Sequence, residues 1–171
     1  MPDDPIGVRR YVLGREQRAQ YGGGMRLQDF SDHRAVLSPD GECATDGLRS
    51  VSWLEMSRWS NQVAGFLADS LAPGERFGVL ARNSLEWLAL YLGACKAGVV
   101  IVPLNVRLKP QEWAYILSDA GVRLVIVDEE LREPLSSALP TGVTERVVLG
   151  SGVTGWSAFD DVVAARPASP P

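Results

Sequence analysis

A glycine-rich hexapeptide is the part of this sequence whose residue types best suit phosphate binding. Gly150–Gly155 reads GSGVTG, the G-x-G-x-x-G spacing of a dinucleotide-binding turn, and follows a short predicted strand at Arg146–Leu149. Glycines with this spacing let backbone N–H groups approach a pyrophosphate at the start of a helix. The helix predicted next, Trp156–Ala165, is short, and neither a second strand nor an acidic ribose ligand follows it. We therefore favour a glycine-rich surface turn over a cofactor site.

Lys96 and the run Ser31-Asp32-His33 are other side chains with catalytic chemistry. Lys96 lies in the last turn of a predicted helix, where its charge opposes the helix dipole. We prefer this structural role to a catalytic one. Ser31, Asp32 and His33 have the three side-chain types of a hydrolase triad. Triads, however, are assembled by the fold, and adjacent residues cannot face one another in that way.

Two cations flank Leu108 in a predicted strand-to-helix loop, where they could contact an anion. Because loops lie at the surface, Arg107 and Lys109 are expected to be solvated. Cys43, in a predicted turn, and Cys95, in a predicted buried helix, are expected to be reduced thiols. A single histidine and no Cys-x-x-Cys pair leave a zinc site with few ligands. The sequence thus predicts no catalytic, cofactor-binding or metal-ligating residue in this chain.

The composition is that of one globular domain. The 171 residues are 46% hydrophobic and carry a formal net charge of −4. The lysines and arginines form no basic stripe, which argues against a nucleic-acid partner. The longest apolar stretch, Leu85–Leu104, is interrupted by charges, glycine and proline, so no membrane span of ~20 residues is expected. The polar start of the chain has no signal-peptide core, which predicts a cytoplasmic location.

Alternating strand and helix signals between residues 74 and 128 decide the predicted fold. Three short, continuously apolar runs read as buried strands, namely Arg76–Ala81, Val99–Val102 and Val122–Val127. Continuous rather than alternating apolar character is typical of parallel strands that are covered on both faces. The predicted fold class is therefore α/β, a doubly wound, mainly parallel sheet with helices on both faces.

The most apolar helix is predicted between the first two of these strands, over Ser84–Ala97. Asn83 and Glu86 have the spacing of a capping box at its start. Apolar residues surround the helix nearly completely, so it is expected to be buried on more than one side. Leu88 and Leu92 are predicted to face the sheet.

Other helices are predicted from their end signals. One begins at Lys109, with Pro110 in its first turn, and ends at Gly121. Another, Ser52–Ala72, begins with a capping box of Ser52 and Glu55. A weaker helix is predicted over Glu129–Leu139.

The two ends of the chain are the least informative. Residues 1–30 contain only a sparse helical pattern at Arg9–Tyr21, and Val36–Leu37 is predicted as an edge strand. Residues 166–171 are proline-rich, which predicts a linker or a truncated end. Residues 31–165 are therefore assigned to one α/β subdomain.

Three segments carry a family resemblance. Cys95–Asn105, CKAGVVIVPLN, resembles the L-K-A-G-x-x-x-V-P-L-[DN] motif of the adenylate-forming superfamily, which includes acyl-CoA synthetases, aryl-CoA ligases, luciferases and peptide-synthetase adenylation domains. Ser52–Met56 is similar to the family's [ST]-[YW]-x-E-L helix start, and Pro73–Val79 to its x-G-D-R-V-A-[IL] segment. The continuation Asn105–Leu108 is most similar to the fatty acyl-CoA synthetase branch. The resemblance covers about residues 30 to 165.

The resemblance implies the N-terminal piece of an AMP-forming acyl-CoA synthetase. Such enzymes use ATP and Mg²⁺ to turn a carboxylic acid, here a fatty acid, into an acyl-adenylate, and then pass the acyl group to coenzyme A. The family's phosphate loop, [ST]-S-G-[ST]-T-G-x-P-K-G, has no counterpart, because Gly155 is followed by Trp-Ser-Ala without proline or lysine. The family's later segments and its C-terminal lysine are also missing. We therefore expect no ATP, Mg²⁺ or coenzyme A site here, and no activity of the chain alone.

Alternative interpretations belong to other functional classes. The chain could be an interaction or regulatory module that pairs with a full-length synthetase or with another copy of itself, or a non-functional remnant. It could belong to an aryl-CoA ligase or to a peptide-synthetase adenylation domain. An independent small-ligand-binding α/β domain is a further alternative, without a phosphate-binding turn to support it. The expected partner is the remainder of the synthetase or a self-copy, and the carboxylic acid binds only to the full-length parent.

Overall fold

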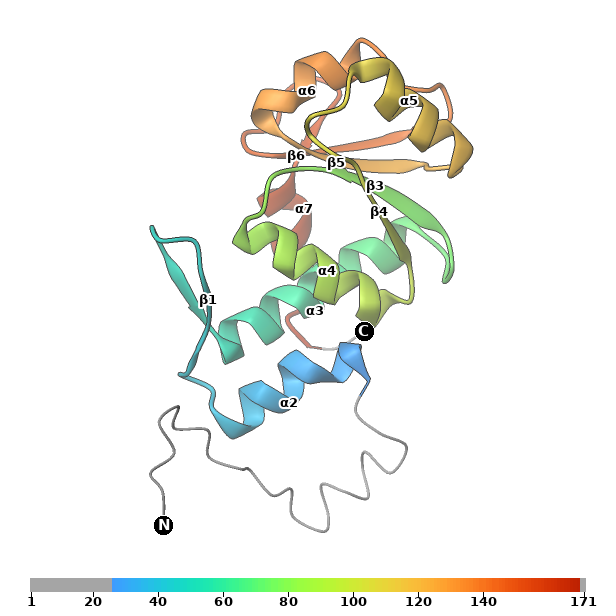
Figure 1. Cartoon of the computed structure of the whole chain (residues 1–171). Coiled ribbons are helices and arrows are strands. Elements are labelled where there is room, and N and C mark those ends of the chain that lie inside the picture. The colour runs from blue at the N-terminus through green and yellow to red at the C-terminus, as the bar shows by residue number, and fades with distance from the viewer. Residues whose placement is uncertain (1–25, 170–171) are drawn as a thin grey trace, which may run out of the picture.

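The computed structural model describes residues 26–169, which build a parallel sheet with helices on both faces (Figure 1). The five strands of the sheet are β3 (Arg76–Leu80), β4 (Val100–Pro103), β5 (Leu124–Asp128), β6 (Glu145–Leu149) and β7 (Ser157–Ala158). Their spatial order is β4-β3-β5-β6-β7, and every neighbouring pair is parallel. The predicted α/β fold is confirmed, and the three predicted central strands differ from the observed ones by one or two residues at their ends.

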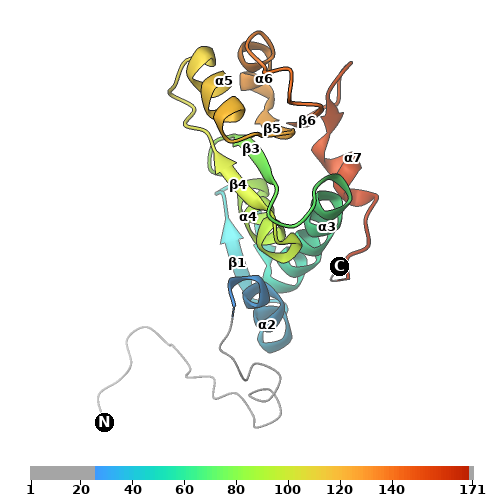
Figure 2. The same cartoon turned by 90° about the vertical axis from the view of Figure 1, so that its right-hand side faces the viewer.

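Helices cover the two faces of the sheet in separate groups. One face is covered by α3 (Trp53–Ser70), α4 (Leu85–Ala97) and α7 (Phe159–Ala164), and the other by α5 (Pro110–Asp119) and α6 (Glu129–Ser136) (Figures 1 and 2). The strand β5 shows why both groups are needed. Its residues Leu124 and Ile126 pack with α3 and α4, whereas Val125 and Val127 pack with the residues of α5 and α6. All four are fully buried, so this strand is continuously apolar.

The order of the strands reverses direction once, between β3 and β5. From β3 the chain passes through α4 to β4 on one side, then through α5 back across β3 to β5 on the other side. In open α/β sheets, ligands bind outside the carboxyl ends of the strands at such a switch point. The strand β4 lies at one edge of the sheet, and its last residue is Pro103.

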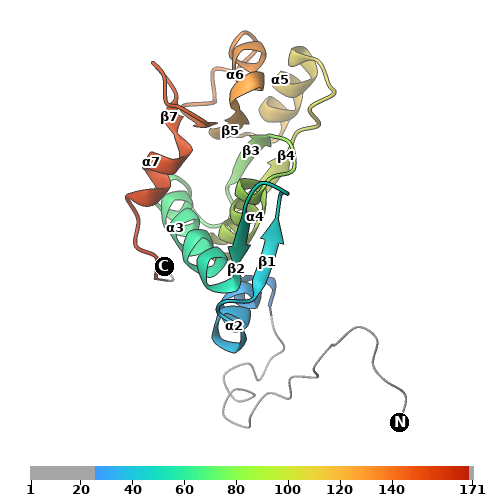
Figure 3. The same cartoon turned by 90° about the vertical axis from the view of Figure 1, so that its left-hand side faces the viewer.

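The segment before α3 differs from its prediction. Residues 36 and 37, predicted as an edge strand, end the helix α2 (Phe30–Leu37), which follows a 3₁₀ turn η1 (Leu27–Asp29). The reason is tertiary packing: Ser31 and Ala35, four residues apart, are buried, while Val36 is 73% exposed, which is a helical rather than a strand pattern. Cys43, predicted in a turn, lies in β1 (Glu42–Thr45), which forms an antiparallel hairpin with β2 (Ser50–Ser52) (Figure 3).

The end of the described chain also differs from its prediction. The predicted helix Trp156–Ala165 begins only at Phe159, because Ser157 and Ala158 form β7 and pair with Val147 and Val148 of β6. The two parallel strands are joined by a short loop instead of the helix that usually connects such a pair.

The helices α3 and α4 each begin directly after a serine whose side chain accepts a hydrogen bond from an N–H group of the first turn. The Ser52 capping box is confirmed, since the Glu55 N–H donates to Ser52 Oγ at 3.3 Å and the Ser52 N–H donates to Glu55 Oε2 at 2.7 Å. The Asn83 capping box is wrong. Ser84 caps α4 instead, and its Oγ accepts the Trp87 N–H at 3.2 Å, so the residue three positions after the cap is not Glu86.

A close contact between α3 and α4 depends on a glycine. A Cβ atom at Gly93 would lie 2.5 Å from Val63 Cγ1 and 3.2 Å from the Ala64 nitrogen, so only glycine lets the two helices approach this closely. Of the two leucines predicted to be in the core, Leu92 is buried at 5% exposure. Leu88 is half-buried and packs against the same core cluster.

Within residues 26–169, no helix is long and apolar enough to cross a membrane. The helical pattern predicted at Arg9–Tyr21 and the last two prolines lie outside the described residues. Of the predicted linker, residues 166–169 are described. They lie beside α3, where the carbonyl groups of Arg166 and Ala168 accept hydrogen bonds from Gln62 and Asn61.

Candidate functional site

The carboxyl ends of β3, β5 and β6 surround a hollow of about 310 Å³ at the switch point of the sheet. Asp128 is the last residue of β5, Gly150 follows β6, and Glu86 lies in the first turn of α4 after β3. Asp160, from the start of α7, completes the acidic part of the lining. We call this feature the switch-point hollow. Its charged lining consists of carboxylates.

Asp128, at the end of β5, is half-buried in the lining of the hollow. Burial raises the pKa of its carboxyl group, and the backbone N–H of Arg82 partly opposes this by donating to Asp128 Oδ2 at 2.8 Å. The guanidinium group of Arg82 points elsewhere, since its Nη1 lies 2.6 Å from Glu130 Oε2. Arg82 therefore neutralises an exposed glutamate rather than lining the hollow.

Glu86 is held by an arginine from the hairpin β1–β2. Arg49 donates from Nη2 to Glu86 Oε1, and its guanidinium carbon lies 5.8 Å from the centre of the Trp59 ring. Burial opposes ionisation of Glu86, but hydrogen bonds and the charge of Arg49 outweigh it and keep the Glu86 pKa below its usual value. This ion pair joins the hairpin to the start of α4.

Gly150–Gly155, the predicted surface turn, forms the exposed loop between β6 and β7. Val153 and Trp156 close a tight turn through reciprocal backbone hydrogen bonds of 3.0 and 2.8 Å. Gly155 has φ +81°, a conformation that favours glycine. At the other end of the loop, a Cβ atom at Gly150 would lie 2.8 Å from Glu129 Oε2. A carboxylate therefore stands where a phosphate cradle would need a cation or N–H groups.

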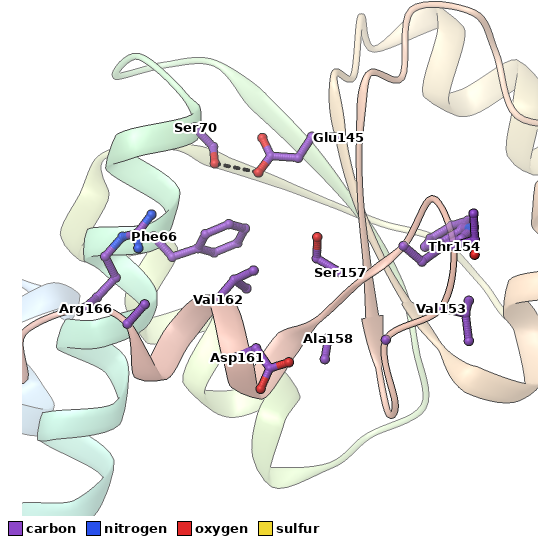
Figure 4. A pocket seen from close by; sticks show the side chains of 13 residues that line it. Phe66, Ser70, Glu145, Val153, Thr154, Ser157, Ala158, Asp161, Val162 and Arg166 are labelled. Atoms are coloured by element: carbon purple, nitrogen blue, oxygen red, sulfur yellow. Dashed lines mark hydrogen bonds between the residues drawn. The ribbon is translucent and has the colours of Figure 1, made fainter.

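A second hollow, a groove of about 930 Å³, lies between this loop, α3 and α7 (Figure 4). Ser70 Oγ donates to Glu145 Oε1 at 2.9 Å on one wall. Phe66 and Val162 supply apolar surface. Arg166 is the arginine of the lining, and its Nε lies 2.7 Å from Asp69 Oδ2. Arg166 Nε makes no hydrogen bond of good geometry, and its charge is balanced by Asp69, so the groove offers a phosphate one paired cation rather than a convergent set of donors.

Lys96 is buried, which its predicted role of opposing the helix dipole did not anticipate. Its side chain is 5% exposed, and Nζ donates to Asp32 Oδ1 and to Asn61 Oδ1 at 2.6 Å each. Burial lowers the Lys96 pKa, and the carboxylate of Asp32 opposes that change. Ser57 Oγ also donates to Asp32 Oδ1, at 2.6 Å. Asp32 is therefore engaged by Lys96 and Ser57, and the adjacent residues do not form a triad with it.

The remaining candidates lie apart from both hollows. Arg107 and Lys109 are exposed, as predicted, and their backbone N–H groups donate to the side chains of Asn105 and Glu112. Cys43 and Cys95 are both free thiols. Across residues 26–169, no three His, Cys, Asp or Glu side chains are arranged to hold a metal ion.

Glu86 and Asp128 line the switch-point hollow but are not among the site candidates predicted from the sequence, where Glu86 appears only in a capping box. Both follow predicted strands, and parallel strands bring their carboxyl ends to one edge, so the ends of the strands were an available signal. No comparable signal exists for Lys96 and Asp32, which are 64 residues apart.

Comparison with known proteins relates the whole described chain to one family. A family model described as AMP-binding enzyme matches residues 27–169. The fatty acid–[acyl-carrier-protein] ligase ScoC of Streptomyces coeruleorubidus is 35% identical over 112 residues, which are 64% of this chain and 21% of that protein. The 3-hydroxybenzoate–CoA ligase of Aromatoleum sp. is 35% identical over 144 residues, or 82% of this chain and 26% of that protein.

A solved structure shows the same fold. The anthranilate CoA ligase AuaEII, crystallised with anthranoyl-AMP, matches with a TM-score of 0.79 and 28% identity over 85% of this chain and 29% of that one. The chain thus spans between a fifth and a third of the length of these proteins.

Proposed function

This chain belongs to the AMP-binding enzyme family of adenylate-forming ligases, and from this premise we propose that it is the N-terminal α/β piece of an AMP-forming acid–thiol ligase. The complete ligase would activate a carboxylic acid with ATP, release pyrophosphate and transfer the acyl group from the adenylate to a thiol. The observation that supports this proposal is the family match over residues 27–169, together with the parallel sheet shared with an aryl-CoA ligase.

A fatty acid is the substrate class that we propose, with coenzyme A as the thiol. The resemblance of Asn105–Leu108 to the fatty acyl-CoA synthetase branch supports this choice. The ligase ScoC, named for a fatty acid and an acyl carrier protein, also supports it. The similarity to a 3-hydroxybenzoate ligase makes aromatic acids the alternative. We place the ligase in the cytoplasm, where ATP and coenzyme A are available.

We propose that the chain alone does not bind ATP and is inactive. A phosphate oxygen about 4 Å from one carboxylate of the switch-point hollow would be repelled by about 4 kcal/mol at an effective dielectric constant of ~20. One charge-assisted hydrogen bond contributes only about 1.5–3 kcal/mol. Arg82 is paired with Glu130, and the Gly150–Gly155 loop has no cation. The hydrogen-bond donors for the triphosphate would therefore come from the remainder of the ligase, and we propose the same origin for the groups that bind Mg²⁺ and coenzyme A.

The test is a pyrophosphate-release assay on the purified 171-residue chain. With ATP, Mg²⁺, coenzyme A and a series of fatty and benzoic acids, the chain should release no pyrophosphate above a blank. Calorimetry at millimolar Mg²⁺–ATP should show no saturable binding. The matched positive arm extends the chain by the coding sequence that continues in frame beyond Pro171, and this longer protein should turn over fatty acids.

Two outcomes would contradict different parts of the proposal. Micromolar Mg²⁺–ATP binding by the chain alone would show that it contains a nucleotide site. An extended protein that releases pyrophosphate with benzoates, and not with fatty acids, would overturn the substrate class while leaving the ligase assignment intact.

A further inference from the structure

A series of polar contacts connects the helix α2 with the segment that follows α7, through the buried side of α3 and α4. Asp32 of α2 accepts from Lys96 of α4, and Lys96 also donates to Asn61 Oδ1 of α3. The other end of the Asn61 amide, Nδ2, donates to the carbonyl of Ala168 at 3.0 Å. We call residues 165–169 the exit segment, and Figure 3 shows the chain returning along α3 after α7.

The cation fixes which way the Asn61 amide points. Asn61 is 3% exposed, and the Lys96 side chain is 5% exposed, so neither group can exchange its partner for bulk water. An ammonium group has donors only, so the oxygen of the amide must face Lys96. The NH₂ group is then left facing Ala168, whose carbonyl is an acceptor. A reversed amide would place donor against donor on one side and acceptor against acceptor on the other.

We propose that Lys96 is a positioning residue that couples the docking of α2 to the path of the exit segment. Its ammonium group holds α2 through Asp32, and it orients the Asn61 amide that holds Ala168. The coupling consists of contacts among residues 32–168 and involves no catalytic step. It therefore does not depend on the proposed ligase activity.

A neighbouring contact supplies an internal control. Gln62, next to Asn61 on α3, donates from Nε2 to the carbonyl of Arg166 at 3.1 Å. This hydrogen bond does not involve Lys96, so Gln62 holds the exit segment without the cation. Loss of Gln62 should loosen the exit segment and leave α2 unchanged.

The experiment measures amide hydrogen exchange by NMR in the 171-residue chain and in three variants. The exit segment is read from the N–H groups of Ala165 and Arg166, which donate to the carbonyls of Asp161 and Val163. Lys96→Met, which keeps the length of the side chain and removes its charge, should speed exchange in both α2 and the exit segment. Asn61→Asp keeps an acceptor for Lys96 but loses the donor to Ala168, so only the exit segment should exchange faster. Gln62→Met should likewise affect only the exit segment. Each increase should be about two- to tenfold, the factor for one net hydrogen bond.

Lys96→Met with a faster α2 and an unchanged exit segment would overturn the coupling. If the Lys96→Met protein does not fold, the double variant Asp32→Ala/Lys96→Met, which removes both charges, takes its place, and Asp32→Ala alone is its comparison. An exit segment as protected in Asn61→Asp as in the parent chain would show that the Asn61 amide does not hold Ala168, and the proposal would then be wrong.

Discussion

Asp128, at the end of β5, carries a charge that burial makes unfavourable. Burial raises its pKa above the ordinary value of 3.8, so between these two pKa values the folded chain binds more protons than the unfolded chain. The free energy of unfolding contributed by this group therefore falls as pH rises through that window, and stays lower at neutral pH. The charged form is tolerated because the Arg82 N–H donates to it.

Asp128→Asn should remove this pH dependence. Asparagine keeps a carbonyl oxygen for the Arg82 N–H and has no charge, so the variant should gain stability relative to the parent at pH 7 compared with pH 3. Urea denaturation of both proteins across that range measures the difference. Asp119→Asn, at an exposed position at the end of α5, is the control and should show a smaller change. A difference between parent and Asp128→Asn that does not vary with pH would contradict this explanation.

Leu92 and Leu88 occupy the same helix with different burial, and this gives a second prediction for single residues. Leu92→Ala should cost about 2–5 kcal/mol of unfolding free energy, because a side chain with 5% exposure leaves a cavity behind. Leu88→Ala should cost clearly less, since Leu88 is half-buried and the site can refill with solvent. Chemical denaturation of both variants tests the order, and equal losses would show that α4 packs differently from the structure.

At the scale of elements, the contact of α3 with α4 is the most demanding in the fold. Gly93→Ala should destabilise the chain by about 1–3 kcal/mol, because a methyl group there meets Val63 and the backbone of α3. Gly142→Ala is the matched control: a Cβ atom there has no atom within 4 Å, and the variant should be close to neutral. Denaturant melts measure the loss of unfolding free energy in both variants. Equal losses would contradict the close contact between α3 and α4.

The elements that the sequence predicts well are those in which one local signal dominates. The strands β3, β4 and β5 are continuously apolar, and burial on both faces requires that pattern wherever they lie in the sheet. The start of α4 was placed one residue early, because Asn83 and Ser84 both have capping side chains and the choice between them depends on backbone conformation. The helix α2 and the two-residue strand β7 are too short for periodicity, and their form follows from contacts with α3 and β6.

The same distinction holds for the candidate site. Asp128 could be found because strand ends in a parallel sheet converge on one edge. The pairing of Asp32 with Lys96 could not be predicted in this way. The two residues are 64 positions apart and meet only because α2 packs against α3 and α4.

In the whole molecule, the buried Lys96 makes the layer of α3 and α4 depend on the helix α2. Asp32→Ala would leave the ammonium group without its carboxylate and should cost up to about 3 kcal/mol, below the value for a fully buried pair because the Asp32 side chain is 34% exposed. The double variant Asp32→Ala/Lys96→Met removes both charges and should recover part of this loss. Thermal melts of the single and double variants measure the recovery. A double variant less stable than Asp32→Ala would show that the charge pair is not the source of the loss.

The outer edge of β4 is poorly suited to pairing with a strand of another molecule. The N–H groups of Val100 and Leu104 donate inward, to the carbonyls of Glu75 and Val79. Along a strand, the N–H groups point alternately to either side, so Ile101 and residue 103 face outward. Residue 103 is Pro103 and has no N–H, which leaves Ile101 as the outward donor within β4. Val100 is 45% exposed and would favour adhesion, yet the edge cannot form a continuous ladder with another strand. Concentrated solutions of this protein should therefore resist growth into cross-β aggregates from this edge.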